Sequence, residues 1–221
     1  RLAETWYGPG AADGWRTIPL LRGQVAHDAD PAAARAAARA RLGLGADDYV
    51  VSSFGMLGST KLNQRLLDAY LASPLAADPR CRLVFVGAND PGPYGIELLR
   101  AISERGAGAR IDITGFVTAE AYQDWLAASD CGVQLRTQTR GETSASVLDC
   151  LMHGLPSIVN AHGGAADLPP DALCMLPDLF EDSELTAALA ELHANPARRA
   201  ALAQAGRAHI AHHHAPGAVG A

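Results

Sequence analysis

From Tyr49 onward, short apolar runs alternate with longer amphipathic runs, and this alternation constrains the fold more than any other feature. The apolar runs are typical of buried β-strands: YVVSSFG, RLVFVG, ARIDITGF, DCGVQL and PSIVN. Helical patterns follow the first four runs at 63–72, 95–106, 119–129 and 144–154, and two more, at 182–195 and 196–214, close the chain. Because strand–helix–strand crossovers are right-handed, the pattern predicts an α/β fold with a Rossmann-like, doubly wound parallel sheet.

The segments before and after this alternation, residues 1–44 and 206–221, do not show it. Residues 1–44 read as a linker and a helix that lead in from an N-terminal domain outside this chain, with Asp30 as helix cap, Pro31 as first helical residue and Gly43 beyond the end. We expect one domain over 45–205 and a helix end with a tail over 206–221. Because the chain begins with arginine rather than Met, we expect it to be a piece of a longer protein.

Composition and charge limit the classes of molecule that this protein is expected to bind. The 221 residues carry 18 basic and 24 acidic side chains, a net charge of −6, which disfavours nucleic acid and anionic membrane surfaces as partners. No apolar run approaches the roughly 20 residues of a membrane span, and no signal peptide opens the chain. The four widely spaced cysteines form no Cys-x-x-Cys pair, so we expect buried, reduced thiols in a cytoplasmic protein.

The loop after the first predicted strand, GMLGSTK, is glycine-rich and contains Gly55, Gly58 and Lys61. In doubly wound sheets ligands bind beyond the carboxyl ends of the strands, where this loop lies. It is not a P-loop, because its glycines are three residues apart and Leu62 follows the lysine. A glycine-rich turn that opens a helix still offers N–H groups to a phosphate, and Lys61 adds a positive charge. The alternative is a tight turn with a solvated lysine.

The loop after the fourth predicted strand, RTQTRGETS, carries the strongest signal. Thr143 and Ser144 are good N-cap residues for the helix that follows, so the positive end of its dipole points at the ligand crevice. Arg136 and Arg140 lie in the same loop, and positive charge therefore converges there.

Two carboxylates accompany these cations. Glu142 and Asp149 are seven residues apart, about two helical turns, so both can face one cleft. Asp149 lies between Leu148 and Cys150 in an otherwise apolar helix, and a buried acid of this kind needs a partner, which ligand hydroxyls would supply. The alternative is a helix-capping Glu142 and a structural ion pair at Asp149.

The order of these motifs resembles the C-terminal domain of the group 1, family four glycosyltransferases. The resemblance covers about residues 45–205, and its most specific part is the acidic pair followed by HGLPSIVN. It implies one half of a GT-B fold, in which two Rossmann-like domains face each other across a cleft. It also implies a retaining enzyme that moves a hexose from a nucleoside-diphosphate sugar to a glycan or lipid-linked acceptor, and a fragment that is inactive alone.

The resemblance also assigns roles to residues. In that family the lysine matching Lys61 contacts the donor diphosphate, the acid matching Asp149 binds the ribose, and the first acid, here Glu142, contacts the sugar. The backbone matching Phe116 and Val117 lies against the base. The resemblance thus makes Lys61 and Glu142 catalytic and gives donor binding to Gly55, Gly58, Phe116, Val117, Arg136, Arg140, Thr143, Ser144 and Asp149.

The partners follow by the same implication: the donor, the acceptor and the protein's own N-terminal domain, which leaves open peripheral membrane association through that domain. No cofactor or metal is implied, since the nucleoside-diphosphate sugar is a substrate. His209 and the adjacent residues 212–214 superficially suggest a metal site, but neighbouring residues on a helix point to different faces. His162, which follows the fifth predicted strand, is either a cleft residue or a turn residue.

Three departures from the family pattern stand out. Met56 replaces an arginine that usually follows the first glycine, the second acid is Asp rather than Glu, and the acids are one residue closer together than usual. The RGETS form of the loop occurs in bacterial relatives and is interpreted as a subtype. The competing hypothesis is a catalytically inactive sugar-nucleotide-binding or interaction module with the same fold, for which Met56 is the motivation.

Overall fold

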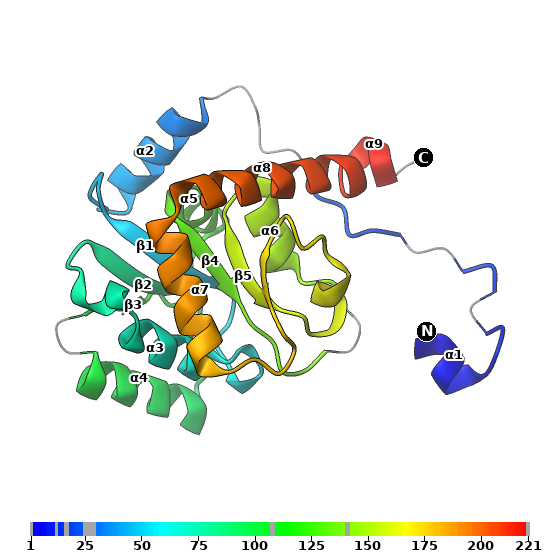
Figure 1. Ribbon diagram of the computed structural model, residues 1–221, viewed down its shortest axis with the longest axis horizontal. Helices are drawn as coiled ribbons and strands as arrows, with labels where there is room; N and C mark the ends of the chain where they lie inside the picture. Colours follow the sequence, from blue (N-terminus) through cyan, green and yellow to red (C-terminus); the bar gives the residue numbers. More distant parts are fainter. Residues whose placement is uncertain are drawn as a thin grey trace.

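The computed structural model describes residues 2–11, 13–15, 18–23, 30–106, 109–139 and 142–219. Within these residues six strands form one sheet, in which every neighbouring pair is parallel (Figure 1). The strands are β1 (Tyr49–Phe54), β2 (Cys81–Val86), β3 (Arg110–Ile113), β4 (Cys131–Gln134), β5 (Ser157–Asn160) and β6 (Cys174–Leu176). Their order, β3-β2-β1-β4-β5-β6, reverses direction between β1 and β4, so the predicted doubly wound fold is confirmed.

The described helices include the seven that the sequence pattern predicts, whereas the first and the last, Leu2–Tyr7 and Pro216–Val219, lie in segments that were expected to be a linker and a tail. The α-helices are α1 (Leu2–Tyr7), α2 (Pro31–Arg41), α3 (Asn63–Ala72), α4 (Pro93–Arg105), α5 (Ala119–Ala128), α6 (Ala145–His153), α7 (Asp182–Ala194), α8 (Pro196–His213) and α9 (Pro216–Val219). Three 3-10 turns also occur: η1 (Ser59–Lys61), η2 (Pro74–Ala77) and η3 (Gly163–Asp167). The strand β6 was not predicted, because three residues are too short a run for its apolar character to stand out.

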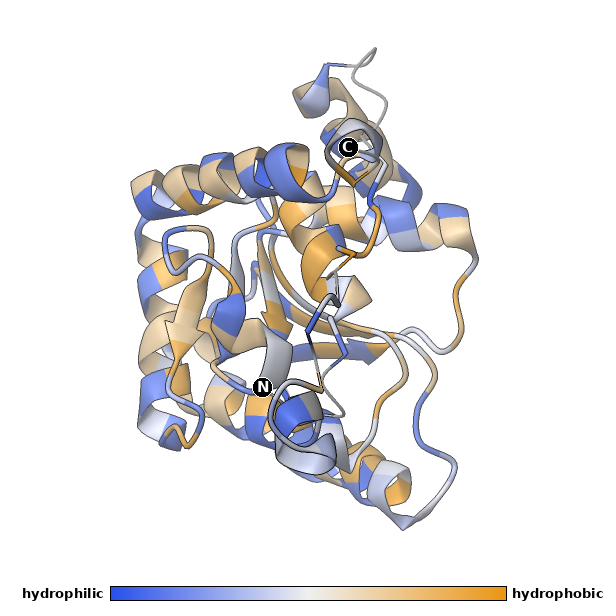
Figure 2. Cartoon of the chain, turned by 90° about the vertical axis from the view of Figure 1, so that its right-hand side faces the viewer, coloured by the Kyte–Doolittle hydropathy of each residue, from blue (hydrophilic) through white to orange (hydrophobic). Residues whose placement is uncertain are grey.

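Helices cover both faces of the sheet. On one face Leu67 of α3 and Leu189 of α7 pack with Val51 of β1. On the other face Leu126 of α5 packs with Val50, the preceding residue of the same strand. Successive strand residues thus enter opposite cores, which explains why the strands are apolar at nearly every position. Figure 2 shows the hydrophobic residues concentrated towards the middle of the domain and hydrophilic residues on the outer helices.

The helix α2 packs closely on the domain, although the sequence places it in the lead-in segment. Its Arg39 is 5% exposed, and the guanidinium donates to the backbone oxygens of Gly45 and Ala128. The division of the chain at 44/45 and 205/206 stays a prediction, and α8 runs without interruption across the second of these points. None of the described helices combines the length and the apolar character needed to cross a membrane.

Candidate functional site

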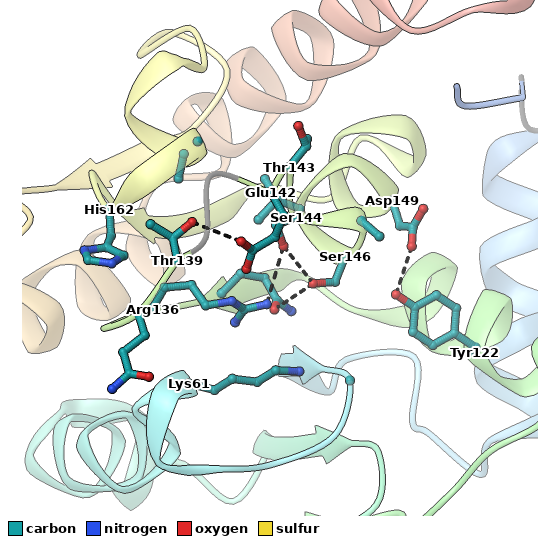
Figure 3. Close-up of a pocket in the computed structure, with 17 residues that line it drawn as sticks. Lys61, Tyr122, Arg136, Thr139, Glu142, Thr143, Ser144, Ser146, Asp149 and His162 are labelled. Carbon is teal, nitrogen blue, oxygen red and sulfur yellow. Dashed lines mark hydrogen bonds between the residues drawn. The ribbon is translucent and has the colours of Figure 1, made fainter. Parts of the chain in front are cut away.

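A pocket of about 380 Å³ opens at the carboxyl ends of the central strands β1, β4 and β5 (Figure 3). It lies at the point where the strand order reverses, which is the usual place for ligands in such sheets. Its described lining residues come from the end of β4, from the loops after these strands, from η1 and η3, from the first half of α6 and from α5. They are Gly55, Lys61, Tyr122, Gln134, Arg136, Gln138, Thr139, Glu142, Thr143, Ser144, Ala145, Ser146, Val147, Asp149, His162, Gly164 and Ala165.

Lys61 extends along one wall of the pocket. Its ammonium group donates to the backbone oxygen of Phe54 at 3.4 Å, and no ion pair joins it to any described carboxylate. Burial, and secondarily the positive charge of Arg136, lower the pKa of Lys61 to about 8. A bound anion would favour the charged ammonium and so raise this pKa again, and the lysine therefore gains from a negatively charged ligand.

Arg136 brings a second cation to the same pocket. The side chain of Asn160, at the end of β5, accepts from the Arg136 amide at 2.9 Å and donates to its carbonyl oxygen at 2.8 Å, which fixes the loop after β4. The amide of Thr137 donates to the oxygen of Thr60, so this loop is also attached to η1. Burial lowers the pKa of Arg136, and Glu142 acts in the opposite direction. The two cations are therefore held in one partly desolvated space.

The helix α6 begins at the pocket, and Ser144 is its N-cap, although its side chain accepts no hydrogen bond from a backbone amide of the first turn. The Ser144 hydroxyl instead lies 3.2 Å from that of Ser146 and accepts from the Arg136 guanidinium at 3.5 Å. The Ser146 hydroxyl in turn bonds the side chain of Gln134 at 3.1 Å. The first turn of a helix has N–H groups without intrahelical acceptors, so this end of α6 favours an anion in the pocket.

Glu142 and Asp149 both line the pocket but differ in their surroundings. Glu142 is exposed and accepts from the Thr139 hydroxyl at 3.3 Å. It lies among Arg136, Thr139 and Ser144 in Figure 3, whereas Asp149 lies at the end of the pocket opposite His162. His162 itself bonds Asp178 through Nδ1 at 2.7 Å.

Asp149 has two protein partners. Its Oδ2 atom accepts from the Tyr122 hydroxyl at 3.1 Å, and its Oδ1 atom forms an ion pair with Nε of Arg22 at 2.8 Å. Burial is the main reason why the pKa of Tyr122 is raised, so this phenol stays a donor. The structural ion pair that the sequence left as an alternative is therefore present, and the same carboxylate also faces the pocket.

The predicted site residues divide into three groups. The structure brings Gly55, Lys61, Arg136, Glu142, Thr143, Ser144 and Asp149 together in the pocket. Three others, Gly58, Phe116 and Val117, are not among its described lining residues. The amide of Gly58 donates to the side chain of Asn63. Val117 packs against the hydrophobic core, and the Phe116 side chain is 90% exposed. The predicted residue Arg140 lies outside the described residues.

Sequence reasoning missed several lining residues. Gln134 and Ser146 had a usable signal, since one is a polar residue at the end of an apolar strand and the other lies in the first turn of the helix. Tyr122 of α5 had none, because only the packing of α5 beside α6 brings its hydroxyl to Asp149.

A possible metal-ligand set lies at the amino ends of the strands, where β2 begins, on the side of the sheet away from the pocket. Potential ligand atoms of Asp78, Cys81 and His193 are within 4.8 Å of one another, and no other such group is found among the described residues. The Asp78 carboxylate is already held by both the backbone and the guanidinium of Arg80. This cluster is remote from the pocket, whose described lining offers hydrogen-bond donors and cations rather than a set of metal ligands.

The fold and the pocket together define a Rossmann-like domain with an anion-receptive site at its switch point. Residues 49–195 match the family described as Glycosyl transferases group 1. The chain belongs to this family of glycosyltransferases.

Individual relatives agree with this assignment. The chain is 31% identical over 183 residues to a D-inositol 3-phosphate glycosyltransferase of Saccharomonospora viridis, a match that covers 79% of the chain and 42% of the relative. The chain thus spans less than half the length of this curated relative.

Solved structures show the same fold. HepE of Anabaena in complex with UDP superimposes with a TM-score of 0.73 at 20% identity, over 85% of this chain and 50% of that one. The C-terminal domain of a group 1 glycosyltransferase, LpcC, of Francisella tularensis gives 0.72 at 17% identity, over 82% of this chain and 93% of that one. The sheet and its flanking helices are those of one Rossmann-like half of the GT-B glycosyltransferases.

Proposed function

We propose that this chain is the donor-binding domain of a retaining glycosyltransferase, which moves a hexose from a nucleoside-diphosphate sugar to a glycan or lipid-linked acceptor. The observation that carries the proposal is the convergence of Lys61, Arg136 and the N-terminus of α6 on one pocket at the switch point of the sheet. Membership of the group 1 family supports it. HepE, which has the same fold, was crystallised with UDP.

The chemistry of the pocket suits a departing diphosphate. Negative charge grows on this leaving group as its bond to the sugar breaks, and donors that are already in place stabilise such charge most effectively. Lys61 and Arg136 would offset that charge, with the first N–H groups of α6 as further donors. Because burial keeps both cations partly desolvated, each contact with the diphosphate is worth more than it would be in water.

The two acids would share the rest of the donor. Asp149, at one end of the pocket beside Tyr122, would accept hydrogen bonds from the ribose hydroxyls. Glu142, in the middle of the pocket, would position the sugar next to the breaking bond. The remaining parts of the proposal are that acceptor contacts come from an N-terminal domain, that the domain alone is inactive, and that no cofactor takes part.

We also propose a cytoplasmic location, where nucleotide sugars would be available as substrates. The four cysteines are free and buried, as expected for a protein of a reducing compartment.

Isothermal titration of this chain with UDP, GDP and dTDP tests the proposal. At least one of them should bind with a dissociation constant below about 1 mM, and Lys61→Ala should weaken that binding about tenfold or more, since a hydrogen bond to a charged group contributes about 1.5–3 kcal/mol. A folded chain that binds none of the three at millimolar concentration would overturn the proposal.

The second candidate is an inactive binding module of the same fold. Met56, which stands where the family usually has an arginine, is 65% exposed and is not among the described residues that line the pocket. The two candidates differ in turnover by the protein together with its N-terminal domain. Transfer or hydrolysis of a nucleotide sugar supports the enzyme, and nucleotide binding without either reaction supports the module.

A further inference from the structure

Residues 18–23, called the strap below, lie against the domain next to Asp149. Two hydrogen bonds fasten the strap to the end of α8: the amide of Arg22 donates to the carbonyl oxygen of His214 at 2.8 Å, and Nδ1 of His214 bonds the carbonyl oxygen of Leu20 at 2.8 Å. His214 is the C-cap of α8 and is buried. One of the histidines that superficially suggested a metal site thus holds the strap in place.

The fastened strap carries Arg22 to the donor pocket. Nε of Arg22 lies 2.8 Å from Oδ1 of Asp149, and the two side chains are only 15% and 18% exposed. The guanidinium also donates to the carbonyl oxygen of Leu21 at 2.9 Å, which limits its freedom. Arg22 is not among the described residues that line the pocket, whereas Asp149 is. The arginine therefore approaches the carboxylate from outside the pocket and leaves its inner side accessible.

The carboxylate keeps enough acceptor capacity for a ligand. An ionised carboxylate has about four lone-pair sites. The Tyr122 hydroxyl takes one on Oδ2, whereas Arg22 forms an ion pair with Oδ1 but donates no hydrogen bond to it through Nε. The sites that remain are enough for the two hydroxyls of a ribose. Partners on both oxygens also fix the rotation of the carboxylate, so its free lone pairs have a defined direction.

Charge gives the arginine a second effect. Besides His162, the ionisable side chains that the described lining contributes are two cations, Lys61 and Arg136, two acids, Glu142 and Asp149, and the phenol of Tyr122. An uncompensated Asp149 would repel a diphosphate bound nearby. Because Arg22 lies in contact with this acid, it offsets the repulsion without occupying space in the pocket.

We propose that Arg22 is a positioning residue for the donor, which orients Asp149 towards the ribose hydroxyls and offsets its charge, so that the strap forms part of the donor site. This inference rests on the proposed function. It makes nucleotide binding depend on a segment that precedes the domain in sequence and that no local motif connects with the pocket.

The test compares ribose and deoxyribose ligands on the whole chain with Arg22→Ala and Arg22→Lys. Whichever of UDP and GDP binds the wild type more tightly is titrated alongside its 2′-deoxy form. The wild type should prefer the ribose form. Arg22→Ala should lose about tenfold in affinity for it, because Asp149 loses the cation that orients it and offsets its charge, but less for the deoxy form, so the preference shrinks. Arg22→Lys keeps the charge without the planar geometry and should fall between the two.

Arg41→Ala is the matched control, since Arg41 also pairs with an aspartate, Asp124, but lies on α2 and does not line the pocket. It should leave both affinities unchanged. Circular dichroism identifies variants that fail to fold. If Arg22→Ala fails to fold, Arg22→Gln, whose side chain is neutral and similar in shape to that of arginine, takes its place. Equal losses for both ligands, unchanged affinity, or tighter binding by the folded variant would each overturn the inference. A wild type that binds neither nucleotide refutes the proposed function instead.

Discussion

The ammonium group of Lys61 lies so close to Gly55 that a Cβ atom on that glycine would stand 2.5 Å from Nζ. Gly55 directly follows β1 and has a φ of +95°, a conformation that residues with a side chain rarely adopt. The glycine after the first strand therefore has two functions. It turns the chain at the edge of the sheet, and it leaves room for the lysine in the pocket.

Gly55→Ala should therefore affect binding as well as stability. The left-handed conformation costs an alanine about 1–2 kcal/mol, and the new methyl group displaces the Lys61 ammonium. We expect nucleotide affinity to fall about tenfold, as for the loss of one charged contact. Isothermal titration and thermal unfolding measure the two effects separately.

Gly43→Ala is the control for the stability cost of placing an alanine in a backbone conformation that favours glycine. Gly43 has a φ of +66°, and a Cβ there would meet nothing within 4 Å. It should lose a similar amount of stability and keep its nucleotide affinity. If both glycine variants kept full affinity, the steric link between Gly55 and Lys61 would have no functional consequence.

The titration of Lys61 predicts a pH dependence of nucleotide binding. In the free protein burial lowers the pKa of Lys61 to about 8, and a bound diphosphate favours the charged form. As pH rises from 7 to 9 the free protein loses this proton, so affinity should fall about tenfold, the change in the protonated fraction over that interval. Terminal phosphates, with a pKa of about 6, do not change charge in this range.

Lys61→Arg isolates this group, since arginine stays charged at every pH in the interval. Its affinity should be nearly independent of pH, and a wild-type slope that persists in the variant would assign the titration to another group. The pH dependence of stability has the opposite sign to that of nucleotide affinity. Between pH about 8 and 10.5 the unfolded chain holds a proton that the folded chain has lost, so Lys61 makes the free energy of unfolding rise with pH in that window.

The two acids of the pocket should differ in their effect on nucleotide affinity. Asp149→Ala removes the proposed ribose acceptor and leaves Arg22 without its partner, so we expect UDP or GDP affinity to fall about 30-fold, within the range for charged hydrogen bonds. Glu142→Ala should change nucleotide affinity less than about threefold, since its proposed contact is with the sugar. Titration of both variants with the same nucleotide gives the order directly.

Asp124→Ala is the control for losing an aspartate that pairs with an arginine, because Asp124 pairs with Arg41 on the surface of the domain. It should bind nucleotide like the wild type. A larger loss for Glu142→Ala than for Asp149→Ala would reverse the proposed roles.

The sequence alone predicts the sheet and most helices because their signal is local. The helix α3 extends over Asn63–Ala72, the residues that its periodicity predicts. The convergence of Lys61 and Arg136 was also predictable, since both follow parallel strands and the carboxyl ends of such strands meet at one edge.

The missing parts depend on contacts between distant segments. Asp149 looked out of place in an apolar helix, and that oddity predicted a partner without naming Arg22 or Tyr122, which come from the strap and from α5. The family resemblance places the backbone at Phe116 and Val117 against a base, which stays a prediction, and it did not indicate that the Phe116 side chain is largely exposed. Side-chain direction in a loop depends on tertiary packing, which the residue pattern does not encode.

The buried Arg39 of α2 leads to a prediction about stability alone. Its guanidinium donates to the backbone oxygens of Gly45 and Ala128 and pairs with Asp130 at 3.4 Å. Removal of one partner from such a buried network typically costs about 3–5 kcal/mol, so Arg39→Ala should lower the melting temperature by roughly 6–20 °C for a chain of this size. Arg39→Lys should recover little, because an ammonium cannot span the same acceptors. Arg41 is an exposed arginine on the same helix, and Arg41→Ala should cost less than about 1 kcal/mol.

Nucleotide affinity of folded Arg39→Ala at low temperature should match the wild type, because α2 packs on α5 and contributes no residue to the described lining of the pocket. A large stability loss would establish α2 as part of the folded domain, whereas a loss no larger than that of Arg41→Ala would make it a detachable lead-in.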